Sequence, residues 1–412
     1  MADRSDNSQD AQRPARGGMF ARHNVLMVAV AVVVLAGILM GRALVVDDSG
    51  PDAQPIAPAI PSPPPTGEPW AMFRGNSACT GVAASSLPET LTLLWTREAG
   101  GGVTSTAAIV GGAVYVGTDA GEVLAIDLAS GDFRWRYKAG RAVSASPCVA
   151  GGRVLVGDDG GTFHAIDAAT GQAAWTYQAD GGIHSSAVVH GDLVIFGADD
   201  ARVHGVSLKD GAQRWEVETW DQVWSPPSVA EGQLLVCGCD GQLRIIDAAT
   251  GRERFAIVLD SPVASAVVRF GDLAYVTSMK GELLCVDVAK GEFVWEKTYG
   301  DDVLFYSSMA MVGERIIVGA RDNRLRCLNR AGGEVIWDFQ TQGNVNSSPV
   351  VVGERVFVGS DDGSLYAVAL ADGRRLWRFR SGGVLSASPA VGQGRLVIGS
   401  EDGAIYCFGP KL

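Results

Sequence analysis

The residues best suited to metal binding or redox chemistry are five histidines and seven cysteines in a chain of 412 residues. The histidines are His23, His164, His184, His190 and His204. The cysteines form no adjacent Cys-Cys pair and no C-x-x-C-H haem motif, and Cys237-Gly-Cys239 alone is too weak a pattern to indicate a metal or redox site. We therefore expect packing or surface roles for these side chains, with Cys79 the most exposed thiol.

Carboxylates could act as a general base or bind Ca²⁺, but both uses require them to converge in a pocket. Asp127, Asp167, Asp247 and Asp287 instead recur at one position of a repeated turn. An Asp at such a position hydrogen-bonds the backbone of its own turn. These residues are predicted to cap turns, and the sequence indicates no catalytic and no metal-binding residue.

The turns belong to a repeat whose clearest copy runs from Ala165 to Trp175. An apolar strand ends in Asp-x-x-Thr-Gly, and Trp175 follows Gly171 by four residues. The glycine supplies the positive φ that such a hairpin turn needs. A large aromatic residue recurs at the Trp175 position, and we call these residues the docking residues. They are Trp95, Trp135, Trp175, Trp215, Phe255, Trp295, Trp337 and Trp377.

The docking residues are spaced by 40 residues, with one step of 42. A period of roughly 40–45 residues with four short strands is typical of a β-propeller blade. The predicted fold class is therefore all-β, an eight-bladed β-propeller. The strand Leu91–Thr96 has no repeat before it, and the last repeat ends at Phe408 without an outer strand. We expect the first strand to complete the last blade and close the ring.

The innermost strand of each blade borders the central channel, and the residue nine positions after each docking residue should lie on it. These residues differ in size and polarity, unlike residues that only hold a blade together. They are Thr104, Ser144, His184, Trp224, Ala264, Leu304, Asn346 and Ser386. Bulky members would either plug the channel or form a binding site of aromatic and polar groups, and the sequence leaves both readings open.

A candidate face for a ligand or partner lies on the side of the ring that carries the loops between blades. Acidic pairs fall there, so we expect an acidic face with few cations, such as Arg141, Lys280 and Arg321. Aromatic residues inside a polar rim are typical of interface hot spots. The candidate residues are His184, Trp224, Asp301, Asp302, Phe305, Tyr306 and Asn346.

The first 69 residues predict a membrane attachment. Residues 1–24 read as a basic cytoplasmic tail, 25–46 as a transmembrane signal anchor, 47–69 as a proline-rich linker and 70–412 as the propeller. The run 25–46 is long enough to cross a bilayer and carries one charge, Arg42. Arginines precede it and Asp47-Asp48 follow, which places the propeller in the periplasm or outside the cell. A cleaved signal peptide is the alternative.

The segment before the first strand, Trp70–Asn76, is predicted to cap one face of the ring. The formal charge of −12 argues against nucleic acid or an anionic membrane surface as a partner of the folded part. A closed ring whose edges are all paired needs no second copy, so we expect a monomeric ring.

The Ala-x-Asp-x-x-Thr-Gly-x-x-x-Trp stretch resembles the docking motif of the PQQ-type (pyrroloquinoline quinone-like) propeller repeat family, and the resemblance covers about residues 70–408. That family contains dehydrogenases that bind the quinone with Ca²⁺ and also non-enzymatic, BamB-like scaffolds of the cell envelope. The dehydrogenases carry long insertions, which this sequence lacks. The resemblance therefore implies a scaffold without cofactor or enzymatic activity that binds envelope proteins or peptides, with a PQQ-dependent dehydrogenase as the alternative.

Overall fold

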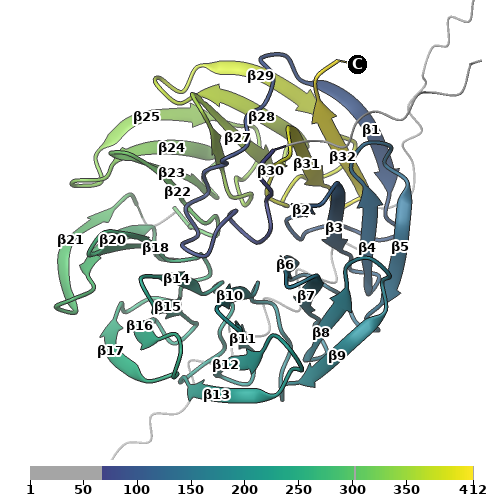
Figure 1. Ribbon diagram of the computed structural model, residues 1–412. Coiled ribbons are helices and arrows are strands. Elements are labelled where there is room, and N and C mark those ends of the chain that lie inside the picture. The colour runs from purple at the N-terminus through teal and green to yellow at the C-terminus, as the bar shows by residue number, and fades with distance from the viewer. Residues whose placement is uncertain (1–66, 301–302, 412) are drawn as a thin grey trace, which may run out of the picture. The chain divides into compact units, whose positions relative to one another are not determined.

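The computed structural model describes residues 67–300 and 303–411, and in this part of the chain every regular element is a β-strand. The predicted tail, the predicted transmembrane segment and residues 47–66 of the linker lie outside the described residues. No helix within the described ranges is long and apolar enough to cross a membrane. The described strands form eight antiparallel, four-stranded sheets arranged as a ring (Figure 1). The predicted eight-bladed propeller is confirmed.

Blades 1 to 7 each consist of four consecutive strands that run outward from the central channel, and blade 8 takes its outer strand from the start of the propeller. The innermost strands are β2 (Ala108–Val110), β6 (Cys148–Ala150), β10 (Val188–His190), β14 (Ser228–Ala230), β18 (Val268–Phe270), β22 (Ala310–Val312), β26 (Val350–Val352) and β30 (Ala390–Gly392). The second strands are β3 (Ala113–Gly117), β7 (Arg153–Gly157), β11 (Leu193–Ala198), β15 (Gln233–Cys237), β19 (Leu273–Thr277), β23 (Arg315–Ala320), β27 (Arg355–Ser360) and β31 (Arg395–Gly399). Blades are numbered 1 to 8 in this order.

The third strands are β4 (Glu122–Asp127), β8 (Thr162–Asp167), β12 (Arg202–Ser207), β16 (Gln242–Asp247), β20 (Glu282–Asp287), β24 (Arg324–Asn329), β28 (Ser364–Ala369) and β32 (Ala404–Gly409). The outer strands are β5 (Phe133–Lys138), β9 (Ala173–Gln178), β13 (Gln213–Glu218), β17 (Glu253–Val258), β21 (Glu292–Thr298), β25 (Val335–Gln340), β29 (Arg375–Arg380) and, for blade 8, β1 (Thr92–Glu98). The middle residues of second and third strands are buried because neighbouring blades cover both of their faces, whereas outer strands alternate between covered and exposed residues.

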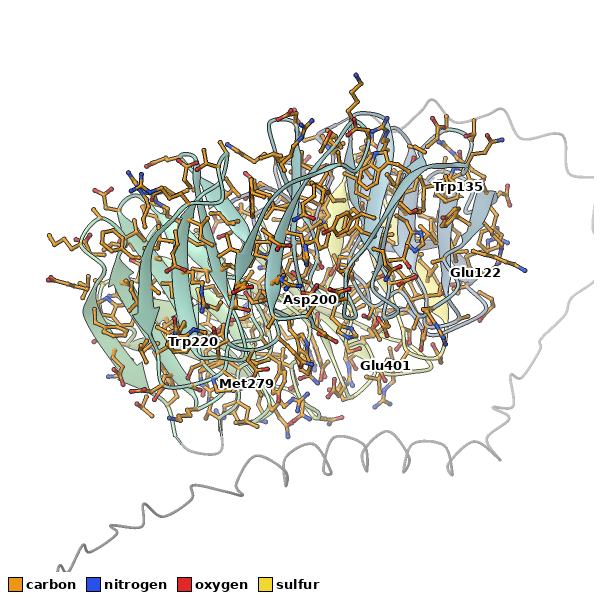
Figure 2. The ribbon with its side chains drawn as sticks, turned by 90° about the horizontal axis from the view of Figure 1, so that it is seen from below. Glu122, Trp135, Asp200, Trp220, Met279 and Glu401 are labelled. Carbon is orange, nitrogen blue, oxygen red and sulfur yellow. The ribbon has the colours of Figure 1, made fainter. Side chains whose placement is uncertain are left out.

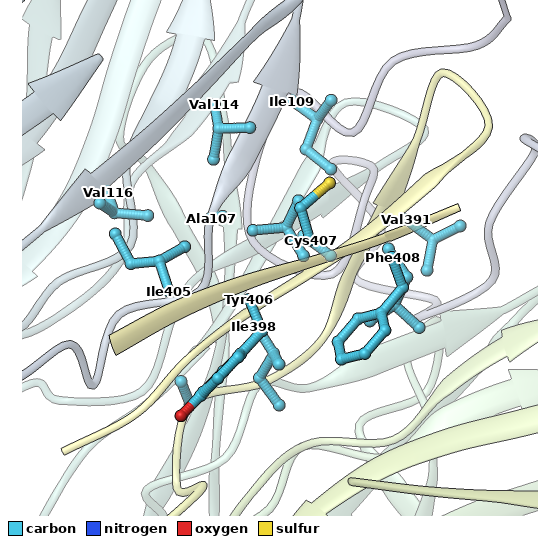
Figure 3. Close-up of a cluster of buried hydrophobic side chains, with 14 of the residues drawn as sticks. Ala107, Ile109, Val114, Val116, Val391, Ile398, Ile405, Tyr406, Cys407 and Phe408 are labelled. Atoms are coloured by element: carbon cyan, nitrogen blue, oxygen red, sulfur yellow. The ribbon is translucent and has the colours of Figure 1, made fainter. Parts of the chain in front are cut away.

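The ring closes as predicted, because β1 pairs antiparallel with β32 and becomes the outer strand of blade 8. Trp95 lies opposite Cys407 in this ladder. Side chains of blades 8 and 1 form one buried cluster across the closure, in which Ile405 and Phe408 are fully buried (Figure 3). Closure thus removes the free edge of the last blade and joins the two ends of the propeller through its core.

Each of the first seven docking residues packs on the turn glycine of the next blade, which confirms their predicted role. A Cβ on Gly131, whose φ is +75°, would lie 2.8 Å from the Trp95 ring, so only glycine fits at this contact. Four indole Nε1–H groups also donate to a carbonyl of the next blade, and these bonds are Trp95 to Leu128 (3.0 Å), Trp135 to Ala168 (3.0 Å), Trp175 to Leu208 (3.1 Å) and Trp337 to Leu370 (3.0 Å).

Residues 68–83, which we call the strap, cross one end of the channel. Their backbone hydrogen-bonds the ends of inner strands on opposite sides of the ring, including Ile109 of blade 1, Val229 of blade 4 and Val351 of blade 7. Figure 1 shows this dark purple segment over the middle of the ring. The predicted cap is confirmed, and the face that it covers, which also carries the turns between first and second strands, is called the strap face.

The strap is fixed by side chains that enter the ring. Trp70 and Arg74 are each 1% exposed. Arg74 Nη2–H donates to the carbonyls of Met309 (2.9 Å) and Pro349 (2.6 Å), and burial lowers the pKa of Arg74 to about 10. Cys79 was predicted to be the most exposed thiol, and this prediction is wrong. The strap carries Cys79 into the ring, where its side chain is buried.

Candidate functional site: the channel mouth

The opposite end of the channel, here called the mouth, is surrounded by the loops between blades and by the turns between second and third strands. In every blade a backbone N–H of this turn donates to a carbonyl of the loop, as Asp159 does to Ala142 (2.9 Å) and Met279 to Pro262 (3.0 Å). The repeat therefore brings two side chains of each blade together at the mouth, one from the segment that leads into the inner strand and one from the turn 15 residues later. The prediction that the first of these lies on the innermost strand is wrong, because the strand begins four residues further on.

The two sets of mouth residues follow the repeat. The set that precedes the inner strands is Thr104, Ser144, His184, Trp224, Ala264, Tyr306, Asn346 and Ser386. The turn set is Asp119, Asp159, Asp199, Cys239, Met279, Arg321, Asp361 and Glu401. Five of the eight turn residues are acidic, so the predicted acidic character holds for blades 1–3, 7 and 8, while blades 4–6 carry Cys, Met and Arg.

The sequence-based choice of Leu304 for blade 6 is wrong by two residues. Ser308 Oγ accepts from Ala266 N (2.9 Å), which is the bond that Ser348 Oγ makes with Ser308 N one blade later (2.9 Å). Tyr306, two residues before Ser308, is therefore the equivalent of Asn346. The two extra residues of this repeat lie before Tyr306, between the outer strand of blade 5 and the mouth.

A hydrogen-bonded chain joins blades 2, 3 and 4 at the mouth. His184 lies between two carboxylates, with Nδ1 3.3 Å from Asp159 Oδ1 and Nε2 3.1 Å from Asp199 Oδ2. Trp224 Nε1–H donates to the other oxygen of Asp199 (2.7 Å), and Ser144 Oγ–H donates to Asp159 (2.8 Å). The rings of His184 and Trp224 meet edge to face at 6.0 Å. Each polar group of this chain is thus held by its neighbours.

The two carboxylates keep His184 charged. Its hydrogen bonds to Asp159 and Asp199 raise the pKa of His184 to about 10, so at neutral pH it is an imidazolium. Burial disfavours the charged form of Asp159, but hydrogen bonds from His184 and Ser144 outweigh burial and hold the pKa of Asp159 below its usual range. Because the two carboxylates lie on opposite edges of one imidazole, they bind His184 and do not converge on a common ion.

A second chain joins blades 6 and 7. The Arg321 guanidinium lies 3.7 Å from the centre of the Tyr306 ring and donates through Nε to Asn346 Oδ1 (2.9 Å). Asn346 Nδ2–H in turn donates to Asp361 Oδ2 (2.8 Å). Burial raises the pKa of Asp361 despite the hydrogen bond from Asn346. Tyr306 therefore presents a ring already covered on one face by a cation.

Blades 4 and 5 give the mouth a surface of different chemistry. Trp220, in the loop before Trp224, is 80% exposed, the largest exposure among the large hydrophobic side chains that are described. Trp224, Cys239 and Met279 are half-buried beside it on the same two blades. Seen side-on, Trp220, Met279 and Glu401 lie on one side of the ring and Trp135 lies toward the other (Figure 2). We call Trp220, Trp224 and Met279 the aromatic sector of the mouth.

The candidate residues chosen from sequence fall into three groups. His184, Trp224, Tyr306 and Asn346 all lie at the mouth. Phe305 does not, since its side chain is fully buried and packs edge to face on Tyr299, so its inclusion is corrected. Asp301 and Asp302 lie outside the described residues. Sequence reasoning missed Trp220, although a Trp where other repeats have Gly, Asp or Gln was a usable signal.

Two other histidines have structural roles. His164 Nε2 lies 3.0 Å from Asp158 Oδ2 and its Nδ1 lies 3.0 Å from the Tyr137 hydroxyl, and His204 makes the same pair of contacts with Asp200 and Tyr177. Within residues 67–300 and 303–411, no group of three or more His, Cys, Asp or Glu side chains is arranged to hold a metal ion.

Comparisons with known proteins find sequence relatives of this chain. A family model described as outer membrane protein assembly factor BamB matches residues 81–297 and 304–411. The curated outer membrane protein assembly factor BamB of Nitrosomonas eutropha is 30% identical over 115 residues, which are 28% of this chain and 27% of that relative. The match to this relative thus spans about a quarter of its length.

Solved structures share the fold at lower identity. BamB from Moraxella catarrhalis is similar with a TM-score of 0.68 and 20% identity, over 78% of this chain and 100% of that one. The quinohemoprotein alcohol dehydrogenase from Comamonas testosteroni has a TM-score of 0.73 and 16% identity, over 84% and 81% of the two chains. A europium-containing methanol dehydrogenase has a TM-score of 0.74 and 14% identity, over 83% and 98%. At these identities the likeness concerns the fold alone.

Proposed function

The chain belongs to the outer membrane protein assembly factor BamB family, and from this premise we propose that it is a non-enzymatic scaffold in outer-membrane protein assembly. The scaffold acts outside the cytoplasm, where it binds other envelope proteins or peptides. The proposal includes a membrane tether, with residues 1–24 in the cytoplasm, 25–46 in the membrane, 47–69 as linker and 70–412 as the propeller.

The observation that carries the proposal is the difference between the two ends of the channel. At the strap face the strap crosses the channel and bonds inner strands on opposite sides of the ring. At the mouth, the side chains of several blades are already fixed by one another, so a partner that binds there meets a preorganised surface. An exposed Trp beside fixed polar groups is the composition expected of an interface hot spot.

The proposed partner is a protein segment that places an apolar side chain against the aromatic sector and basic groups near the carboxylates of blades 1–3, 7 and 8. Trp220 and Trp224 offer amphipathic rings for the first contact. Asp159 and Asp361 already accept hydrogen bonds from Ser144 and Asn346, so their side chains need little further ordering when a cation approaches.

This function is tested by loss and rescue in cells. Removal of the chain should lower the amount of folded barrel proteins in the outer membrane, and the wild-type chain should restore it. Rescue by Trp220→Ala should be impaired, whereas rescue by Trp135→Phe, which changes a docking residue away from the mouth, should succeed. Unchanged barrel proteins after removal of the chain would contradict the proposal.

The dehydrogenase alternative has its own test. The proposal assigns the chain no cofactor and no enzymatic activity. Purified chain incubated with pyrroloquinoline quinone and Ca²⁺ should neither retain the quinone through gel filtration nor reduce a dye with alcohol or sugar substrates. Stoichiometric quinone retention together with dye reduction would overturn the scaffold assignment in favour of a quinoprotein dehydrogenase.

A further inference from the structure

The outer edge of the ring carries one bulge in each blade. Between the third and outer strands the register shifts at the residue before the docking residue, which leaves that residue without a ladder partner. In blades 1–4 the bulged residues are Arg134, Ala174, Arg214 and Arg254. In blades 5–8 they are Val294, Ile336, Leu376 and Leu94. The same structural position is therefore polar or small on one half of the ring and apolar on the other.

Exposed neighbours add to this apolar half, while blade 4 also exposes Phe255 and Val258 on its outer strand. Six large apolar side chains on the outer strands of blades 5–8, each between 41% and 52% exposed, form what we call the apolar rim. They are Phe293, Val294, Val335, Ile336, Leu376 and Leu93. Single exposed apolar residues are normal, but a run over four consecutive blades indicates a surface that is covered in use.

The rim lies toward the strap face, because each outer strand begins at the turn on that face. This is also the face at which the described chain begins: the carbonyl of Glu68 accepts a hydrogen bond from Gln393 N (2.9 Å), in the turn between the inner and second strands of blade 8. Sixty-six residues precede Gly67, and they contain the apolar run 25–46. A propeller tethered through this end stays at high effective concentration near the membrane, so shallow contacts suffice to hold it there.

The chemistry of the rim favours lipid over a charged partner. Its members are mostly branched aliphatic side chains on the outer edge of the ring, and one of them, Leu376, also lines a hollow of about 420 Å³ beside Trp377. Exposed charges of both signs surround the rim, with Lys290, Arg374 and Arg375 beside Glu89, Glu292, Glu334 and Asp372. Burial of apolar surface would therefore drive the contact, with little contribution from net charge.

We propose that the apolar rim inserts its side chains into the surface of the lipid bilayer that holds the tether. The strap face then lies toward lipid along blades 5–8, and the mouth is directed away from the membrane and free to bind a partner. This inference rests on the tether in the proposed function but is independent of any binding at the mouth.

Photo-crosslinking in vesicles tests the inference on the full chain. The photoreactive p-benzoyl-phenylalanine replaces Ile336 in one variant and Arg214, the bulged residue of blade 3, in a matched control. Both are reconstituted into vesicles of phosphatidylethanolamine and phosphatidylglycerol, floated on a density gradient, irradiated and analysed by mass spectrometry. The lipid adduct at position 336 should exceed that at 214 by at least about fivefold, in low and in high salt.

The outcomes separate the rim from the tether. Equal lipid adducts at the two positions in floated vesicles would overturn the rim inference and leave the tether intact. A protein adduct in place of lipid at position 336, when the experiment is repeated in membranes of the expressing cells, would also overturn it by identifying a protein occupant. A chain that does not float with the vesicles would overturn the tether and the rim inference together.

Discussion

Blades 1 and 2 follow the same sequence repeat as blades 4 and 5, but the two pairs differ in which hydrogen bonds they make at equivalent positions. Trp95 and Trp135 donate their Nε1–H to the next blade. At the corresponding junctions further round the ring, Trp215 Nε1 is buried without a hydrogen-bond partner, and Phe255 has no N–H to donate. The junctions into blades 4 and 5 therefore lack a bond that the junctions into blades 1 and 2 possess.

The segments that lead into the inner strands differ in the same way. Ser146 Oγ accepts from Thr106 N and Ser186 Oγ accepts from Ser146 N, both at 3.0 Å, so hydrogen bonds link successive blades around the channel. At the next two equivalent positions stand Pro226 and Ala266, which offer no side-chain acceptor, and proline has no N–H. The series of hydrogen bonds is interrupted there and resumes from Ala266 N to Ser308 Oγ.

At the mouth the contrast is one of chemistry. Blades 1 and 2 present Asp119 and Asp159, whereas blades 4 and 5 present Cys239 and Met279 beside the exposed Trp220. Blades 4 and 5 thus combine weaker structural bonding with the most distinctive surface. A departure from local structural rules at one place, without gain in packing, is expected where function selects the residues.

The largest loss of stability should follow from removal of a docking residue that makes the indole hydrogen bond to the next blade. Trp135→Ala should lower the free energy of unfolding by about 3–5 kcal/mol, because the ring leaves a cavity at a blade junction. Phe255→Ala should cost only about 1–2 kcal/mol, since Phe255 is 39% exposed. Urea unfolding followed by circular dichroism measures both. Equal losses would show that the two junctions are equivalent after all.

The next largest difference in stability should come from two serines that precede the inner strands. Ser146→Ala leaves the buried Thr106 N–H without its acceptor and should destabilise the chain by about 1–3 kcal/mol. Ser225→Ala is the matched control, because Ser225 Oγ is buried without a partner, and its removal should be neutral or slightly stabilising. Midpoints from the same urea series decide. A Ser225→Ala loss as large as that of Ser146→Ala would show that the loss at Ser146 does not come from the missing acceptor.

Restoring the repeat at a variant junction should stabilise it. In the regular junctions the acceptor carbonyl lies 33 residues after the docking residue, and 33 residues after Phe255 stands Val288. Phe255 and Val288 line a surface hollow of about 860 Å³, which leaves room for a larger ring. Phe255→Trp should therefore add about 1 kcal/mol of stability. A destabilised variant would mean that the hollow does not accept the indole.

The last effect concerns the pH dependence of stability that His184 contributes. Its pKa is about 10 in the folded chain and about 6.5 unfolded, so its contribution to stability is complete below about pH 6.5 and is lost as pH rises through 10. His184→Gln should remove this part of the decline between about pH 7 and 10. Thermal melts of both chains over this range provide the measurement, and parallel pH profiles would refute the paired state of His184.

The repeat made most of the fold predictable from sequence. The constant spacing of the docking residues and the unmatched strand before Trp95 determine the number of blades and the closure. The mouth was less predictable, because counting nine residues from each docking residue fails where the repeat contains an insertion. In blade 6, two extra residues moved the equivalent position from Leu304 to Tyr306. Phe305 was misplaced because neighbouring residues on an extended chain point in opposite directions. Cys79 was misplaced because nothing local indicates that the strap enters the ring.

Binding by the aromatic sector tests the central claim most directly. Trp220 is 80% exposed, so Trp220→Ala should leave the thermal midpoint unchanged. It should weaken binding to an envelope protein identified by pull-down with the wild-type chain by about 2 kcal/mol, or roughly thirtyfold in Kd. Thr104→Ala, an exposed mouth residue of blade 1, is the matched control and should bind with wild-type affinity. The measurement is the Kd of each purified variant for that partner. Wild-type affinity of Trp220→Ala, at unchanged stability, would contradict the assignment of the aromatic sector on blades 4 and 5 as the partner-binding site.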